Sequence, residues 1–533
     1  MDRTRLVLGT LALLFCGSAR GGTKLFTFQG DGAYDYLGDS VAAAGDVDQD
    51  GFADVVVGAP GPPGYVRVFS GKNGALVREW AVANSYHAVD GAGDVNQDGH
   101  ADIVVGDGAS VAVYSGKTGA LLYQFADSAA GLGGAVAGAG DVNHDGYADF
   151  LAGARWGSTG GKQANGYVRL YSGKTGAVLY QWNGPSNDDR LGWSVDGAGD
   201  LNGDGFLDVV ATAPHYDDHG VILGMVQAYS GKDGTLLYTL VGSGDYYWGW
   251  EVSGGSDIDK DGFADFVVSA PWDTYGGGNA GRVWAFSGVN HTVLYKWAGG
   301  TGDHLGTSAT CAGDVNGDGY GDVIVGAPDD SAFLLYDGTV RVYSGKDGTT
   351  LVTYHGAWGS DSFGSAVSGA GDVNHDGHAD LVVGQLMDDA SGTDAGKAIV
   401  YSGQDYVASW SNYDKGWPGT KGVPSFTASQ SPVICSSITL DIANSRGATT
   451  AGTLFIGLAA GDLPTAWGGR ILVLPPWTLV SLVVPTAGLS LPVDVLCDSS
   501  YLGLKVYLQV LESDPGASAG VAFTPGLLLV HGL

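Results

Sequence analysis

Glutamate and basic residues are scarce in this 533-residue chain. Of its 57 acidic residues only Glu79, Glu251 and Glu512 are glutamate, the other 54 are aspartate, and 92 residues are glycine. Glutamate favours helices, whereas aspartate and glycine favour turns, so the composition argues against a mostly helical fold. Lysine and arginine total 25, which leaves a formal charge of −32. This excess of negative charge argues against electrostatic binding to nucleic acid or anionic membranes and points towards cations.

Long apolar runs are missing after the N-terminus. The run Leu6–Phe15 follows two arginines and precedes small residues, which is the layout of a signal peptide. We predict a signal peptide over residues 1–22, with cleavage after Ala19 or Gly22. The run is too short to cross a bilayer permanently, and no later segment indicates a membrane span. The sequence therefore predicts a secreted or cell-surface protein.

Cysteine is also rare, with four residues. Cys16 raises a lipoprotein as the less favoured alternative, because Phe15 stands where a lipoprotein signal needs a small residue. Cys435 and Cys497 lie in the same C-terminal region and could pair in an oxidising compartment. Their spacing does not decide whether they do.

A repeat dominates residues 24 to 411. The pattern D-x-[DN]-x-D-G-x-x-D occurs seven times, beginning at Asp46, Asp94, Asp141, Asp200, Asp257, Asp314 and Asp372. Each copy lies between two strand-like segments, and each unit continues with a strand ending in Ser-Gly and then a further strand. Four short strands per unit, repeated seven times, are typical of a propeller, in which each blade buries its faces against its neighbours. We predict an all-β fold with a seven-bladed β-propeller over residues 23–413.

Two segments compete to be the outermost strand of the closing blade. Lys24–Phe28 and Tyr406–Trp410 both resemble the fourth strand of a unit, and the sequence does not choose between them. After a predicted linker at 414–424, residues 425–533 lack the acidic pattern and contain about seven short strand-like runs. We predict a small β-sandwich-like domain there, without an assigned role.

The repeated units resemble FG-GAP repeats, the blades of the integrin α-subunit propeller and of many bacterial secreted proteins. The Phe-Gly element is represented by Leu37-Gly38 and Phe363-Gly364, and the Gly-Ala-Pro element by Gly58–Pro60 and Gly326–Pro328. Unit three departs from the pattern with Arg155 in place of the proline. The resemblance implies a propeller fold; no integrin-like leg domains or membrane span follow in the sequence, so we do not expect the integrin function to carry over.

The acidic loop has the composition of a calcium site. Oxygen-bearing side chains stand at positions 1, 3, 5 and 9, a glycine at position 6 permits a tight turn, and the backbone carbonyl at position 7 adds another oxygen, as Ca²⁺ prefers. An EF-hand is excluded, because position 12 is apolar in every copy, for example Val57 and Val105. No histidine or cysteine has ligand spacing around the loops, which argues against zinc. We predict up to seven structural Ca²⁺ ions.

The predicted ligands, grouped by loop, are Asp46, Asp48, Asp50, Phe52 and Asp54; Asp94, Asn96, Asp98, His100 and Asp102; Asp141, Asn143, Asp145, Tyr147 and Asp149; Asp200, Asn202, Asp204, Phe206 and Asp208; Asp257, Asp259, Asp261, Phe263 and Asp265; Asp314, Asn316, Asp318, Tyr320 and Asp322; and Asp372, Asn374, Asp376, His378 and Asp380.

Aromatic residues gather in loops expected on the propeller face opposite the acidic loops. They lie between second and third strands or between units, and with one arginine they are Arg155, Trp156, His215, Tyr216, Tyr246, Tyr247, Trp248, Trp272 and Tyr275. Trp248 and Trp250 could instead pack between blades. Aromatic loops suit contact with proteins or carbohydrates.

No catalytic motif stands out. The recurring Ser-Gly-Lys lacks the upstream glycine of a phosphate-binding loop and suits a hairpin turn. We therefore predict a monomeric, calcium-binding module for an unidentified extracellular protein or carbohydrate. A propeller-borne hydrolase or polysaccharide lyase is the alternative, because chance pairs of carboxylates are plentiful.

Overall fold

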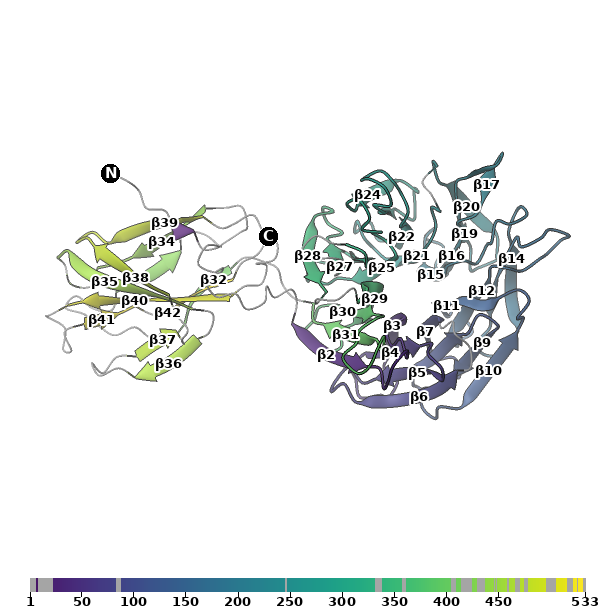
Figure 1. Ribbon diagram of the computed structural model, residues 1–533, viewed down its shortest axis with the longest axis horizontal. Helices are drawn as coiled ribbons and strands as arrows, with labels where there is room; N and C mark the ends of the chain where they lie inside the picture. Colours follow the sequence, from purple (N-terminus) through teal and green to yellow (C-terminus); the bar gives the residue numbers. More distant parts are fainter. Residues whose placement is uncertain are drawn as a thin grey trace. The chain divides into compact units, whose positions relative to one another are not determined.

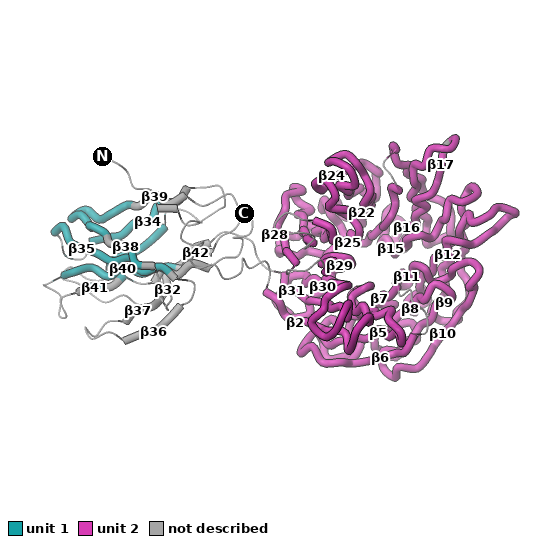
Figure 2. Tube along the Cα trace, viewed as in Figure 1, with its two compact units in different colours: residues 1–22, 405–533 teal, residues 23–404 magenta. Residues whose placement is uncertain are grey.

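The computed structural model describes residues 23–403 apart from 83–87, 245–246, 331–337 and 357–360. It also describes Leu6–Val7 and, in the C-terminal part, residues 409–413, 424–428, 437–444, 446, 448–457, 460–464, 470–473, 478–494, 505–514, 521–524 and 526–530. The chain forms two units, Thr23–Gln404 and Met1–Gly22 with Asp405–Leu533 (Figure 2). The described residues are strands, turns and loops, and they include no helix able to cross a membrane.

The described part of Thr23–Gln404 contains seven four-stranded antiparallel sheets arranged around a centre (Figure 1). We number them in chain order. Sheet 1 holds β3 (Ser40–Gly45), β4 (Asp54–Ala59), β5 (Gly64–Phe69) and β6 (Leu76–Val82); sheet 2 holds β7 (Ala88–Gly93), β8 (Asp102–Gly106), β9 (Ser110–Tyr114) and β10 (Leu121–Ala126); sheet 3 holds β11 (Leu132–Gly140), β12 (Asp149–Ala154), β13 (Tyr167–Tyr171) and β14 (Val178–Asn183).

Sheet 4 holds β15 (Val195–Gly199), β16 (Asp208–Ala213), β19 (Met225–Tyr229) and β20 (Leu236–Val241), with a small hairpin of β17 (Asp217–Asp218) and β18 (Val221–Ile222) beside it; sheet 5 holds β21 (Val252–Ser256), β22 (Asp265–Ala270), β23 (Arg282–Phe286) and β24 (Val293–Ala298); sheet 6 holds β25 (Ser308–Gly313), β26 (Asp322–Ala327), β27 (Thr339–Tyr343) and β28 (Thr350–His355); sheet 7 holds β29 (Phe363–Gly371), β30 (Asp380–Gln385), β31 (Lys397–Tyr401) and β2 (Lys24–Gln29).

The position of a strand within its sheet follows from its side chains. The second strand of every sheet is buried along its whole length, as expected for the valine-rich runs that follow the acidic loops. The first strands are rich in glycine, alanine and serine, and each lies beside the first strand of the next sheet in a closed cycle from β3 through β29 and back. Small residues are required there: a Cβ on Gly138 would lie 2.3 Å from the carbonyl oxygen of Gly91. The predicted all-β propeller fold is confirmed.

Adjacent sheets are held together by apolar packing and by indole hydrogen bonds. Val55 and Val57 of sheet 1 share a buried cluster with Val382 and Val400 of sheet 7. On the outermost strands an indole N–H donates to a turn of the next sheet: Trp80 to Gly119 O at 2.9 Å, Trp182 to Gly234 O at 2.8 Å, and Trp297 to Gly348 O at 2.8 Å.

The closing sheet takes its outermost strand from the N-terminus. β2 pairs antiparallel with β31, so that residues from both ends of the propeller sequence share sheet 7. The competing segment contributes β32 (Ser409–Tyr413), which pairs with β42 (Gly526–Val530) of the other unit. The first of the two alternatives left open by the sequence is therefore the one observed.

The second unit contains one four-stranded and one six-stranded sheet. One has the order β1 (Leu6–Val7), β39 (Leu489–Asp494), β34 (Ser437–Ile442) and β33 (Phe426–Ala428); the other has the order β32, β42, β40 (Lys505–Ser513), β35 (Thr450–Gly457) and β38 (Thr478–Val484), with β41 (Val521–Phe523) beside β40. A hairpin of β36 (Ala460–Pro464) and β37 (Arg470–Val473) completes the described strands. Cys435, Cys497 and residues 414–423 of the predicted linker lie outside the described residues.

Candidate functional site

Each acidic loop joins the first and second strands of a sheet, and its carboxylates fold the turn. In all seven loops the aspartate at position 1 accepts the backbone N–H groups of positions 5 and 6; for Asp141 these bonds are 2.9 Å from Asp145 N and 2.8 Å from Gly146 N. The aspartate at position 5 accepts the N–H of position 7, as Asp204 does from Phe206 at 3.0 Å. The carboxylates of positions 1 and 5 therefore lie inside the turn of the same loop.

Glycine at position 6 has the role expected of it. Its φ angle lies between 84° and 91° in the seven loops, a left-handed region that is costly for other residues. The residue at position 4 shares this region, including Gln49, Gln97, His144, Lys260 and His375 with φ between 56° and 63°.

The aspartate at position 9 does more than the sequence predicted. All seven are fully buried, and each carboxylate accepts two backbone N–H groups at 2.7 to 3.1 Å. One donor belongs to position 2 of the same loop and the other to the glycine of the Ser-Gly turn after the third strand. Asp149, for example, joins Val142 to Gly173. The residue therefore fastens two turns of one sheet together.

Burial raises the pKa of these seven carboxyls against the opposing effect of their backbone donors. The pKa is about 6 in sheets 1 to 5 and about 7 for Asp322 and Asp380. The other aspartates of the loop add to the increase. A bound cation would favour the ionised form, because it places positive charge beside these groups.

The donor sets fit a hard cation. Carboxylate oxygens of Asp46, Asp48 and Asp50 lie within 4.8 Å of one another, as do those of Asp257, Asp259 and Asp265. In two loops with asparagine at position 3, Asn96 Oδ1 and Asn143 Oδ1 are buried and have no hydrogen-bond partner. An oxygen-binding cation would satisfy such acceptors. The backbone N–H of position 7 donates to the carboxylate of position 5. Binding of the cation by the backbone carbonyl of position 7 stays a prediction.

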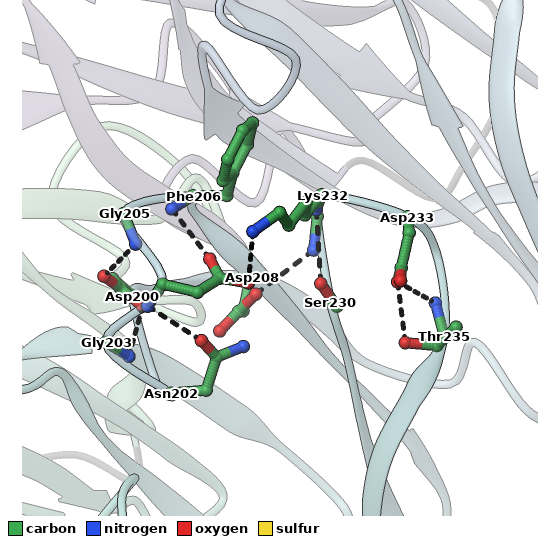
Figure 3. A network of polar contacts seen from close by, with 12 residues as sticks. Asp200, Asn202, Gly203, Gly205, Phe206, Asp208, Ser230, Lys232, Asp233 and Thr235 are labelled. Carbon is green, nitrogen blue, oxygen red and sulfur yellow. Dashed lines mark hydrogen bonds and ion pairs between the residues drawn. The ribbon is translucent and has the colours of Figure 1, made fainter.

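The lysines of the Ser-Gly-Lys turns lie beside the same loops. Lys72, Lys232 and Lys346 approach the position 5 carboxylates of Asp50, Asp204 and Asp318 at 3.8 Å. Figure 3 shows Lys232 next to the loop of Asp200. The sequence predicted only a hairpin turn, because the lysine and the loop are separated by two strands.

Successive loops touch one another through position 4. Gln49 donates to Gly99 O, Gln97 donates to Gly146 O at 2.5 Å, and Lys260 Nζ lies 3.4 Å from Asp318 O. The ring of His144 stacks on Phe206 with centroids 4.3 Å apart, and His375 stacks on Phe52 at 4.0 Å. These contacts connect the loops of neighbouring sheets, including sheet 7 with sheet 1.

A cavity of about 490 Å³ lies at the centre, lined by the first strands of all seven sheets. Four of its lining residues are acidic: Asp39, Asp90, Asp196 and Glu251. Burial raises the pKa of Asp39 and Asp196 to about 6, of Asp90 to about 7 and of Glu251 to about 8. Our sequence prediction did not include these residues.

Polar side chains that line the cavity accept hydrogen bonds from backbone N–H groups of the next sheet. Glu251 accepts Ala309 N at 2.7 Å, Asp196 accepts Gly254 N at 3.0 Å, and Asp90 accepts Gly138 N at 2.9 Å. Ser40 and Ser308 accept Val89 N and Val367 N in the same manner. First strands have no strand partner on their inner side, so these side chains satisfy N–H groups that would otherwise be unpaired.

An aromatic surface, which we call the channel mouth, lies next to this cavity and consists of Trp193, His215, Tyr247, Trp250 and Trp272. Ring centroids are 4.7 Å apart for Trp193 and Trp250 and 4.3 Å for Trp250 and Trp272. His215 contacts Trp193 at 5.5 Å and Tyr247 at 5.0 Å. All five rings are half-buried, and Trp193 and Trp250 also line the cavity.

The aromatic residues singled out in the sequence divide into exposed and packed ones. Trp156 and Tyr275 are exposed, at 43% and 79%, whereas Trp248 is buried and contacts Trp284 and Phe286. Trp248 therefore packs between sheets, whereas Trp250 lies at the channel mouth. Tyr216 packs against a core cluster, and Tyr246 lies outside the described residues.

Two arginines stack on indoles at the edge of the channel mouth, one of them on Trp193 and the other on the neighbouring Trp156. The guanidinium carbon of Arg190 lies 4.2 Å from the ring centre of Trp156, and that of Arg155 lies 4.7 Å from Trp193. Arg190 Nη1 is 2.9 Å from His215 Nε2. Burial, aided by Arg190, lowers the pKa of His215 to about 4, so the imidazole is neutral at pH 7 and accepts this hydrogen bond.

Family models and curated relatives match the propeller. The FG-GAP repeat model matches residues 37–75, 191–232, 248–286, 306–343 and 363–401, and an FG-GAP-like repeat model matches 94–152. Integrin alpha-V of Gallus gallus is 31% identical over 220 residues, which cover 37% of this chain and 20% of that protein. Integrin alpha-7 of Rattus norvegicus is 30% identical over 230 residues, which cover 39% and 19%.

Integrin alpha-8 of Gallus gallus is 30% identical over 244 residues, which cover 42% of this chain and 22% of that protein. The matched part thus spans about one fifth of the length of these integrin subunits. The sheets, the acidic loops and these matches agree: the propeller contains FG-GAP repeats, and the chain is similar, over part of its length, to integrin α subunits.

Proposed function

We propose that the chain is an exported, calcium-stabilised propeller that acts as a binding or adhesion module for an extracellular protein or carbohydrate. The observation that carries this proposal is the channel mouth, where half-buried aromatic rings from different sheets form one continuous surface. Aromatic side chains held on loops by a rigid scaffold are suited to partner contact.

Calcium has a structural task in this proposal. The acidic loops lie between first and second strands, whereas the channel mouth is built from loops that follow second strands and precede first strands. Antiparallel strands place these two sets of loops at opposite ends of a sheet. Calcium would therefore act through the stability of the sheets and not by touching the partner.

A protein and glycan array probed with the purified chain tests the proposal. We expect binding in calcium that is lost in Trp250→Ala and kept in Leu236→Ala, a control that removes an exposed apolar side chain from the outer strand β20. Equal binding by both variants, with unchanged melting temperatures, would contradict a binding role for the mouth.

A hydrolase or polysaccharide lyase is the weaker candidate. Its best residues are Asp196 and Glu251, which line the cavity and have raised pKa values. Both carboxylates, however, accept backbone N–H groups of the next sheet, which gives them a structural task. Turnover of a polysaccharide that Glu251→Gln abolishes would reverse this ranking.

A further inference from the structure

The channel mouth combines positive charge with a wide apolar surface, in a chain that is otherwise strongly acidic. Arg155 and Arg190 stack on Trp193 and Trp156 at its edge, while the formal charge of the whole chain is −32. Stacking on an aromatic ring fixes the plane of a guanidinium group.

Arg190 has no ion-pair partner among the described residues, unlike the cations on the third strands β23, β27 and β31. Arg282, Arg341 and Lys397 each form an ion pair with an almost fully buried aspartate of their own sheet: Asp273, Asp330 and Asp388. Among the described residues, no carboxylate lies within ion-pair distance of Arg190, whose Nη1 faces the neutral His215. The Arg190 guanidinium thus keeps a charge that no described carboxylate pairs with.

The mouth offers little to a peptide that binds as an added strand. Such peptides need unpaired backbone groups at a sheet edge. On the inner strand edges next to the mouth, backbone N–H groups already donate to side chains: Val252 N donates to Ser194 and Ala309 N donates to Glu251. Indole faces suit instead the flat C–H faces of sugar rings, and a guanidinium fork suits a carboxylate.

We propose that the channel mouth binds acidic saccharides, with a uronate carboxylate at Arg190 and Arg155 and sugar rings against Trp193, Trp250 and Trp272. This inference rests on the proposed binding function and narrows its partner to one chemical class. The negative charge of the remaining surface would repel such ligands, so binding would be confined to the mouth.

Titration of the full chain in calcium tests this inference. The probes are tetrasaccharides of glucuronate with N-acetylglucosamine, of galacturonate and of mannuronate, each compared with a neutral tetrasaccharide of equal length. We expect at least one uronate probe to bind at least tenfold more tightly than its neutral counterpart and to weaken as salt is added. Arg190→Gln and Arg155→Gln should each remove most of that preference.

The matched control is Lys296→Gln, which removes one positive charge from the exposed outer strand β24 and should leave binding unchanged. The inference is overturned if no uronate probe exceeds its neutral counterpart, or if both arginine variants bind as the wild type does. Binding of neutral sugars or of an acidic peptide that Trp250→Ala abolishes would overturn it while leaving the proposed binding function intact.

Discussion

The aspartate at position 9 of each loop is a predicted metal ligand, and its structural role can be tested apart from metal binding. Asp149→Asn places an amide NH₂ against Val142 N–H or Gly173 N–H, so one buried donor loses its acceptor at a cost of about 1–3 kcal/mol. We expect its melting temperature to fall in calcium and in EDTA alike.

Asp145→Asn is the matched comparison. An asparagine oxygen can still accept Tyr147 N–H, so this change should lower the melting temperature in calcium and have little effect in EDTA. Equal behaviour of the two variants in EDTA would show that position 9 does not hold the two turns together.

Glu251 makes stability depend on pH. Its pKa is about 8 in the folded chain because of burial, against an ordinary value of 4.5, so between these values the folded state holds a proton that the unfolded state has lost. The free energy of unfolding should therefore fall as pH rises from about 4.5 to 8. Glu251→Gln should flatten the melting temperature between pH 5 and 8 relative to the wild type, measured in excess calcium. An unchanged slope would contradict this.

Local residues of the site were predictable from the sequence and distant ones were not. Positions 1, 5 and 6 interact within one turn, so the pattern itself predicts them. The second partner of Asp149 is Gly173, on a different hairpin, and no local pattern links the two. Glu251 stands where the other repeats carry serine or alanine, and Asp196 stands where most carry alanine, serine or threonine and the second repeat carries Asp90. That departure from the repeat is the signal that could have identified them.

The contacts between neighbouring loops predict coupling between sheets. Gln97→Asn tolerates the left-handed backbone of position 4 but is too short to reach Gly146 O. We expect it to lower the free energy of unfolding by about 1 kcal/mol and to leave the oxygen ligands of both loops in place. Gln124→Asn, on the exposed outer strand β10, is the control; a loss of the same size in both would mean that the contact contributes nothing.

The closing strand shows why the pairing of elements was harder to predict than their type. Lys24–Phe28 and Tyr406–Trp410 carry similar patterns, and pattern alone fixes that a segment is a strand. Partner choice depends on residues far away: Phe28 stacks on Phe69 with centroids 3.8 Å apart, a contact between sheets 7 and 1. Sequence reasoning therefore identified both candidates and could not select β2.

At the scale of the whole molecule, metal removal should lower stability. Each loop brings together four acidic or amide side chains, three or four of them aspartates. A cation that binds only the folded state adds about 2.7 kcal/mol per site at a hundredfold excess over its Kd. We expect EDTA to lower the melting temperature and calcium to restore it, with magnesium less effective because it demands compact octahedral geometry. Calorimetry combined with metal analysis is the measurement that tests this. An unchanged melting temperature in EDTA and no bound calcium would mean that the loops are only turns.

The pairing of β2 with β31 also sets the order in which the chain can fold. Of the propeller strands, β2 leaves the ribosome first and needs a partner from the end of the propeller sequence, so sheet 7 stays incomplete until residue 401 has been synthesised. Contacts between distant residues slow folding, and until then β2 is an unpaired edge open to wrong partners. An exported chain held unfolded during transport would avoid this hazard, because both ends of the ring would then become available together.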